Sequence, residues 1–228
     1  DPPCDASPTP FKDAGEEDSA ALATRAARAA LDDAGVAPEE VDALIVTTST
    51  PHRYTATVSA QVSHALGIEA TCFDLRAGCS AGLMALSQAA LLLQAGCQRV
   101  LIIGCETFSA VIPPPHRTSA LSLGDGAAAL VLGQGEGVIE AISTCSSGSF
   151  KDLVTTPGAM PPNTASIDAG DYRLTGDPER LSEVALEKYV EAISSVLDHS
   201  GRSPAQITRF LPHQTSFAMI DAVCQRVG

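Results

Sequence analysis

Cys79 stands at a turn between a predicted strand and a predicted helix. The run 70–77 is typical of a short strand, and 83–94 is typical of an apolar helix. Gly78 and Gly82 flank the cysteine, so the backbone can turn sharply and a substrate can approach the sulfur closely. The N-terminal end of a helix favours negative charge, which a reactive thiolate carries. The pattern predicts an activated nucleophile, with a buried thiol at a turn as the alternative.

A second reactive side chain follows a later apolar run. His213 comes just after the predicted strand 207–211. Active sites of α/β proteins lie at the carboxyl ends of their strands. A lone histidine is more often structural, but beside a nucleophilic cysteine it is the natural base or proton donor. We therefore predict that Cys79 and His213 act as a pair.

The elements that must position these residues alternate between helix and strand. Nearly continuous apolar strands between helices indicate a parallel or mixed sheet that is covered on both faces. The expected helices cover 19–34, 58–66 and 83–94, open again at 177–178 and cover 217–227, and the expected strands cover 41–48, 70–77, 99–104, 127–133, 138–143 and 207–211.

The chain contains an internal repeat. The segment 31–45 recurs at 197–211 as helix, glycine stop, proline turn and apolar strand, at a constant offset of 166 residues. The repeat predicts two halves with the same βαβ logic. We expect an N-terminal half over 1–147 with the nucleophile turn, a linker or active-site loop region over 148–176, and the start of a C-terminal half over 177–228. The second copy lacks elements of the first, and no predicted strand precedes the first helix, so we expect the chain to be truncated at both ends.

Composition narrows the class of protein. Of the 228 residues, 45% are hydrophobic, which allows a sizeable core, and the net charge of −13 argues against a nucleic-acid partner. No apolar run is long enough to predict a membrane span. The seven cysteines have neither disulfide nor metal-ligand spacing, so we expect reduced thiols, a cytoplasmic protein and no metal site. Four of them lie in or beside apolar runs and are expected to be buried: Cys72, Cys97, Cys105 and Cys145.

Four motifs, in their order and approximate spacing, resemble the ketoacyl synthase III group of the thiolase-like superfamily. They are the runs 73–82, 101–104, 124–129 and 212–214. Together they are specific, and the resemblance covers essentially the whole chain. It implies an α/β fold of duplicated βαβαβ halves in a layered α-β-α-β-α arrangement.

The resemblance also implies an acyltransferase. Cys79 would take an acyl group from coenzyme A or an acyl carrier protein, and its backbone N–H would contribute to an oxyanion hole. His213 would polarise the thioester carbonyl of the acceptor. Arg117, near the coenzyme A entrance, and Ser216, where the family usually has an asparagine, would bind substrate; a solvated loop residue is the alternative for Arg117. The family's third catalytic residue, an asparagine, lies beyond residue 228.

Arg76 departs from the pattern, because many members of the family have a small residue there. It could form a buried ion pair with Asp74 or Glu106. Alternatively, its charge could help to keep Cys79 as a thiolate.

Several functions stay open. In the leading hypothesis, the acyl group passes from Cys79 to a malonyl thioester by decarboxylative Claisen condensation, in fatty acid or polyketide biosynthesis. The alternative transfers an intact acyl or malonyl group to the hydroxyl or amine of a small molecule in secondary metabolism, with His213 as general base. A non-catalytic thiolase-like subunit is the alternative of another class.

We expect a homodimer without a permanently bound cofactor. Coenzyme A or carrier-protein phosphopantetheine thioesters are the expected substrates; the sequence does not reveal the acyl chain or the acceptor.

Overall fold

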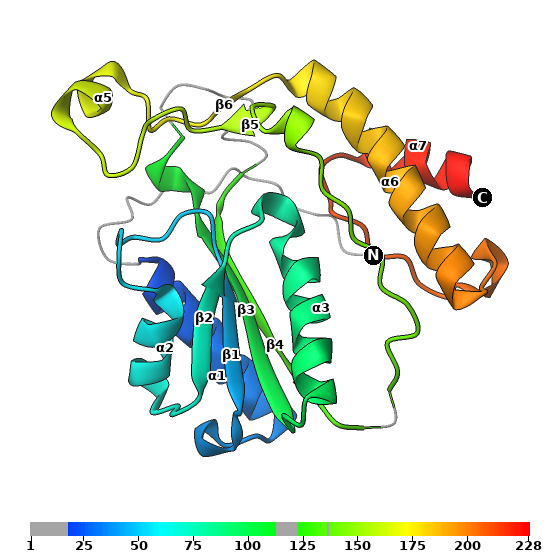
Figure 1. Ribbon diagram of the computed structural model, residues 1–228, viewed down its shortest axis with the longest axis horizontal. Helices are drawn as coiled ribbons and strands as arrows, with labels where there is room; N and C mark the ends of the chain where they lie inside the picture. The colour runs from blue at the N-terminus through cyan, green and yellow to red at the C-terminus, as the bar shows by residue number, and fades with distance from the viewer. Residues whose placement is uncertain (1–17, 113–122, 136) are drawn as a thin grey trace, which may run out of the picture. The chain divides into compact units, whose positions relative to one another are not determined.

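The first part of the chain is built around a four-stranded mixed sheet (Figure 1). The computed structural model describes residues 18–112, 123–135 and 137–228, and the chain divides into two compact units, Asp1–Gln134 and Gly135–Gly228. The strand order in the first unit is β2-β1-β3-β4, with β1 parallel to β2 and β3, and β4 antiparallel to β3. The strands are β1 (Ala43–Thr47), β2 (Thr71–Leu75), β3 (Arg99–Thr107) and β4 (Asp125–Gly133).

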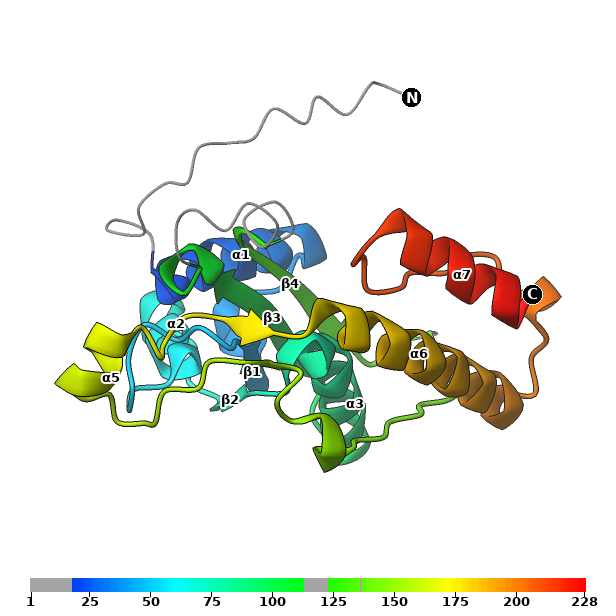
Figure 2. The same ribbon diagram turned by 90° about the horizontal axis from the view of Figure 1, so that it is seen from above.

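Helices cover both faces of this sheet, as Figures 1 and 2 show. On one face, α1 (Ser19–Ala34) and α2 (Val58–Leu66) pack on Leu44 and Val46 of β1. On the other face, α3 (Ala81–Gln94) packs on Ala43 and Ile45 of the same strand. Because successive side chains of a strand point to opposite faces, this five-residue strand is buried throughout. The predicted mixed sheet with two covered faces is confirmed.

The ends of the first two helices follow from their caps. The Asp18 side chain accepts a hydrogen bond from the Ala21 N–H at the start of α1, and Gly35 ends that helix with a φ of 64°. Thr57 and Gly67 do the same for α2. The bounds predicted for both helices are therefore confirmed. The third helix begins two residues earlier than predicted, because a 3-10 turn, η2 (Gly78–Ser80), leads directly into it.

Two helices are the largest elements of the second unit. They are α6 (Pro178–Ser200) and α7 (Phe217–Val227), which pack against each other (Figure 2). The described residues before them form short elements: the 3-10 turn η4 (Gly148–Phe150), β5 (Val154–Thr155), α5 (Thr164–Ala169) and β6 (Thr175–Gly176). No helix among the described residues is long and apolar enough to cross a membrane.

Two predicted strands of the second unit are wrong. Neither 138–143 nor 207–211 is part of a strand ladder in the structure. Ile207 and Leu211 are 45% and 80% exposed, respectively. A strand needs a neighbour to pair its N–H and C=O groups, and no strand within the described residues pairs with either segment. Cys145, expected to be buried, is exposed as well.

The internal repeat is present up to the point where its strand should begin. Both copies end a helix on a left-handed glycine, Gly35 at φ 64° and Gly201 at φ 67°. Both then form a 3-10 turn with proline at its start, η1 (Pro38–Glu40) and η5 (Pro204–Gln206). In the first copy the sequence continues into β1, whereas the second copy continues without a ladder partner.

Candidate active site

Cys79 lies just past the carboxyl end of β2, in the 3-10 turn that leads into α3. Gly78 has a φ of 56°, a conformation that glycine adopts without steric cost. The Ser80 hydroxyl donates to the Ala77 carbonyl oxygen at 2.9 Å and closes the turn locally. The Cys79 side chain is exposed. The strand–turn–helix surroundings expected for this cysteine are thus present, and its reactivity stays a prediction.

The backbone N–H of Cys79 belongs to the first turn of a helical segment. The leading N–H groups of such a segment have no intrahelical acceptor. Cys79 is the second residue of η2. In that turn the Ala81 N–H donates to the Gly78 carbonyl oxygen. An exposed thiol and an N–H without an intrahelical acceptor therefore occur on one residue, as attack on a carbonyl and stabilisation of the resulting oxyanion require.

Asp74 binds the N-terminus of α2 and does not pair with Arg76. Its two carboxylate oxygens accept hydrogen bonds from the N–H groups of Val58 and Ser59, each at 2.8 Å. Arg76 instead donates from Nη2 to the Ser49 carbonyl oxygen at 3.2 Å. Among the described residues, the ion pairs of the structure do not join Arg76 to Asp74 or to Glu106. The ion-pair alternative for Arg76 is therefore wrong.

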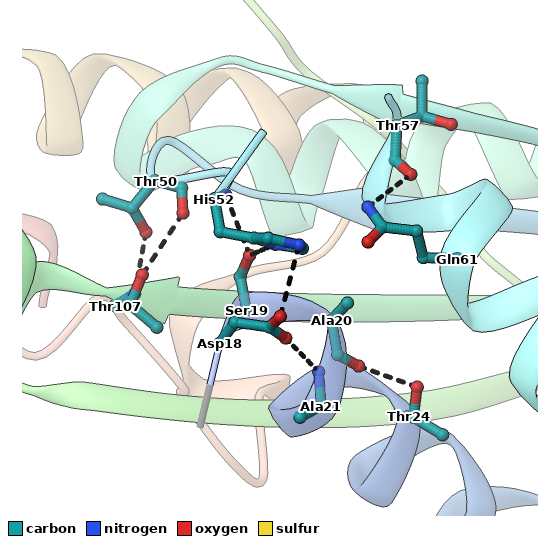
Figure 3. Close-up of polar contacts among 10 residues, drawn as sticks. All are labelled: Asp18, Ser19, Ala20, Ala21, Thr24, Thr50, His52, Thr57, Gln61 and Thr107. Atoms are coloured by element: carbon teal, nitrogen blue, oxygen red, sulfur yellow. Dashed lines mark hydrogen bonds and ion pairs between the residues drawn. The ribbon is translucent and has the colours of Figure 1, made fainter. Parts of the chain in front are cut away.

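Glu106 joins the ends of two neighbouring strands. One carboxylate oxygen accepts from the Ser49 N–H at 2.8 Å, and the other accepts from the Thr50 hydroxyl at 2.7 Å. The Thr107 N–H donates to that hydroxyl oxygen at 2.7 Å, and Figure 3 shows the Thr50 and Thr107 side chains side by side. From the sequence, Glu106 is expected only as an ion-pair partner, because its partners lie 56 and 57 residues away. The feature that could have indicated its role is a carboxylate at the end of an apolar strand.

A serine, a histidine and an aspartate meet beside α1 (Figure 3). His52 places Nδ1 3.1 Å from the Ser19 hydroxyl oxygen and Nε2 3.2 Å from an Asp18 carboxylate oxygen. These residue types can form a hydrolytic triad. However, Ser19 is 0% exposed, and its hydroxyl oxygen also accepts from the His52 backbone N–H at 3.3 Å. The cluster therefore ties the loop after β1 to α1 and presents no nucleophile.

Asp125, in the motif at 124–129, has a clear structural partner. Its carboxylate accepts from the Ser109 N–H at 2.8 Å and from the Ser109 hydroxyl at 2.5 Å. These bonds join the first residue of β4 to the turn that follows β3. Arg117 lies within 113–122, outside the described residues, so its predicted contact with coenzyme A stays a prediction.

In the second unit, the loop that carries His213 is tied to both long helices. The Tyr189 hydroxyl, on α6, donates to the His213 carbonyl oxygen at 3.2 Å, while the His213 side chain is exposed. The Ser216 hydroxyl oxygen accepts from the Met219 N–H at 3.1 Å and caps α7. Cys79 and His213 belong to different units. Their pairing and the binding role of Ser216 therefore stay predictions.

The buried thiol of Cys105 contrasts with that of Cys79. Burial raises the pKa of the Cys105 thiol to about 12, and its side chain is 2% exposed. A thiol of this kind is protonated and out of reach at neutral pH, so it is not a nucleophile. Elsewhere in the described part of the chain, histidine, cysteine and acidic residues form no group of three that could hold a metal ion.

Comparisons with known proteins agree with this arrangement. The family model of 3-oxoacyl-(acyl-carrier-protein) synthase III matches residues 73–148. Beta-ketoacyl-(acyl-carrier-protein) synthase III of Ruegeria pomeroyi is 35% identical over 221 residues, which are 93% of this chain and 67% of the relative. The chain belongs to the synthase III family. The enzyme of the same name from Cereibacter sphaeroides is 38% identical over 90% of this chain and 65% of its own length.

Other family members extend the comparison. The acetoacetyl CoA synthase NphT7 of a Streptomyces species is 34% identical over 92% of this chain and 66% of its own. The crystal structure of 3-oxoacyl-(acyl carrier protein) synthase III, FabH, from Pseudomonas aeruginosa matches with a TM-score of 0.84 at 30% identity, over 94% of this chain and 66% of that one. The predicted thiolase-like α/β fold class is confirmed. The chain spans about two thirds of the length of the curated relatives that it matches.

Proposed function

We propose that this protein is an acyltransferase of the synthase III type, in which Cys79 carries the acyl group. The observation that carries the proposal is the exposed Cys79 thiol in the glycine turn between β2 and α3. Membership of a family whose relatives are named as ketoacyl synthases supports the same chemistry.

In the first step, the Cys79 sulfur attacks the carbonyl carbon of an acyl thioester of coenzyme A or of a carrier-protein phosphopantetheine. A carbon–sulfur bond forms to Cys79, and the thiolate of the donor leaves and takes up a proton. The Cys79 N–H donates to the carbonyl oxygen while it carries negative charge. This step needs no redox cofactor, because no atom changes its oxidation state.

In the second step, a malonyl thioester loses carbon dioxide, and the resulting carbanion attacks the acyl carbon on Cys79. The new carbon–carbon bond gives a 3-oxoacyl thioester and returns the cysteine. His213 donates a hydrogen bond to the thioester carbonyl of the acceptor, where the enolate oxygen develops. The name of the relative NphT7, an acetoacetyl CoA synthase, supports a coenzyme A acceptor as well as a carrier protein.

Transfer of an intact acyl group to a hydroxyl or amine is the second candidate. The serine that follows the histidine motif, Ser216, leaves it open, because the family resemblance expects an asparagine there; the Ser216 hydroxyl oxygen caps α7. In that reaction His213 would remove the proton of the acceptor.

A mass measurement and a product measurement test the proposal. Purified protein is incubated with acetyl-coenzyme A, and its intact mass is measured beside that of Cys79→Ala. A gain of one acetyl group that is absent in the variant supports the proposal, and the absence of any gain contradicts it. Malonyl-coenzyme A is then added, and carbon dioxide and product are measured. Release of carbon dioxide with a 3-oxoacyl product supports condensation, whereas transfer of an intact malonyl group supports the second candidate.

We also propose that the protein forms a homodimer through the outer edge of β2. This strand pairs with β1 on one side, and no other strand of the described residues pairs with it. Such an edge presents unpaired N–H and C=O groups to a second chain. Light scattering should give twice the chain mass, and amide exchange in β2 should accelerate on dilution. A monomer at all concentrations would contradict this proposal.

The free thiols of the described residues support a reducing, cytoplasmic setting.

A further inference from the structure

Side chains continue the pairing of three strands beyond the point where their ladders stop. The last pairs of β1 join Thr47 to Leu75 of β2 and to Gly104 of β3. Two residues later, Ser49 is held at both ends of its backbone. Its N–H donates to Glu106 at 2.8 Å, and its carbonyl oxygen accepts from Arg76 at 3.2 Å. We call this chain of hydrogen bonds, from Arg76 through Ser49 to Glu106, the strand-end clamp.

Glu106 gives the clamp its strength. The side chain is half-buried and no ion pair to it is present among the described residues, so its charge is balanced by hydrogen-bond donors. Both of its oxygens accept, one from the Ser49 N–H and one from the Thr50 hydroxyl. Hydrogen bonds to a charged acceptor are about twice as strong as neutral ones. The Thr50 hydroxyl oxygen also accepts from the Thr107 N–H, so its proton is directed to Glu106.

A glutamine at this position cannot serve both donors. Its single carbonyl oxygen can replace only one carboxylate oxygen, and its NH2 group brings a donor to the other place. If the carbonyl oxygen accepts from Ser49, the Thr50 hydroxyl oxygen accepts from the new NH2 group and from the Thr107 N–H, and the Thr50 proton loses its acceptor. Glu106→Gln therefore removes the charge of the acceptor and one hydrogen bond of Glu106, and so weakens the clamp, while it changes the volume of the side chain very little.

The clamp reaches the turn that carries Cys79. Arg76 is three residues before Cys79, and only Ala77 and Gly78 lie between them. Ala77 has left the strand conformation, with φ −145° and ψ 31°, and Gly78 has a φ of 56°. The hydrogen bond that closes the turn, from Ser80 to Ala77, is local. On the β2 side, Arg76 is therefore the side chain that connects this turn to the neighbouring strands.

We propose that Glu106 and Arg76 are positioning residues for Cys79. Glu106 fixes the Ser49 backbone, and Ser49 fixes the start of the nucleophile turn through Arg76. The inference rests on the proposed role of Cys79 as the acylated nucleophile. Acylation requires that the sulfur and the Cys79 N–H both meet one carbonyl group, and a displacement of about 1 Å can slow such a step as much as 100-fold. Alkylation by iodoacetamide needs an exposed thiolate but no alignment with the Cys79 N–H, so it should depend less on the clamp.

The test compares the two reactions in four variants. Arg76→Met breaks the clamp, Glu106→Gln weakens it, Arg76→Lys keeps a cationic donor, and Glu39→Gln removes an exposed carboxylate outside the clamp as a control. For each protein, acetylation by acetyl-coenzyme A and alkylation by iodoacetamide are timed by the mass of the peptide that contains Cys79, because Cys145 and Cys224 are exposed as well. Relative to wild type, we expect Glu106→Gln and Arg76→Met to acetylate about tenfold more slowly and to alkylate at an unchanged rate. Arg76→Lys should recover part of the loss, and the control should match wild type.

The outcomes separate this inference from the proposed function. Wild-type protein that takes no acetyl group contradicts the proposed function, and with it the role of the clamp. Wild-type protein that is acetylated while Arg76→Met and Glu106→Gln keep its rate contradicts the inference alone. An equal loss of acetylation and alkylation also contradicts it, because it indicates general damage to the turn. Arg76 is exposed, so its variants should fold even where Glu106→Gln does not.

Discussion

Asp74→Asn tests how the sheet holds α2 beside the nucleophile turn. Both carboxylate oxygens of Asp74 accept from N–H groups of the first turn of α2, each at 2.8 Å. The two donors belong to Val58 and Ser59, which are both 0% exposed. Asparagine keeps one acceptor and brings an NH2 group against the other N–H. One buried donor is then left without a partner, and the charge near the helix N-terminus is lost.

The expected loss is about 2–4 kcal/mol in the free energy of unfolding. A hydrogen bond to a charged group contributes about 1.5–3 kcal/mol, and a charge at a helix N-terminus adds about 0.3–1 kcal/mol. Urea titration measures the loss as a lower midpoint at an unchanged m value. Asp33→Asn, on the exposed side of α1, is the matched control and should stay within about 0.5 kcal/mol of wild type. If Asp74→Asn changes the free energy of unfolding as little as Asp33→Asn does, the hydrogen bonds of Asp74 do not stabilise α2 as argued.

Three further changes have defined outcomes. Gly78→Ala should cost about 1–2 kcal/mol in urea titration and slow acetylation of Cys79, because a Cβ disfavours the φ of 56°; an unchanged rate would contradict the account of the turn. Asp18→Ala removes the cap of α1 and the partner of His52, and should lower the free energy of unfolding by about 1–2 kcal/mol; equal stability would show that the cluster holds nothing. The pKa of Cys105 is about 12 in the folded protein and 9.0 as a reference, so its thiol ionises first in the unfolded chain. Its contribution to the free energy of unfolding is therefore full below pH 9 and falls by about 1.4 kcal/mol per pH unit between pH 9 and 12. Urea titrations of Cys105→Ala should lack this part of the alkaline loss of stability, and the same dependence of stability on pH as in wild type would contradict it.

The parts of the fold that local chemistry controls could be predicted from the sequence. The bounds of α1 follow from Asp18 and Gly35, since a cap residue and a left-handed glycine act on their own helix. The turn at Cys79 follows from adjacent residues in the same way. The burial of every residue of β1 follows from an apolar run between helices.

Features that depend on distant partners could not be predicted. An apolar run at 207–211 resembles β1, but only a neighbouring strand turns such a run into part of a sheet, and pairing is not encoded locally. The contacts of Glu106 join residues 56 and 57 positions apart. Opposite charges made an ion pair with Arg76 one alternative from the sequence. In the structure a backbone N–H and the Thr50 hydroxyl donate to Glu106, and a backbone carbonyl oxygen accepts from Arg76.

Peptide mapping shows whether Cys79 carries the acyl group. The protein is incubated with acetyl-coenzyme A and digested at low pH to preserve thioesters, and the mass of each cysteine-containing peptide is measured. We expect one acetyl group on the peptide that contains Cys79 and none on the peptide that contains the buried Cys105. Acetyl groups spread over the exposed cysteines, or an unmodified Cys79, would contradict it.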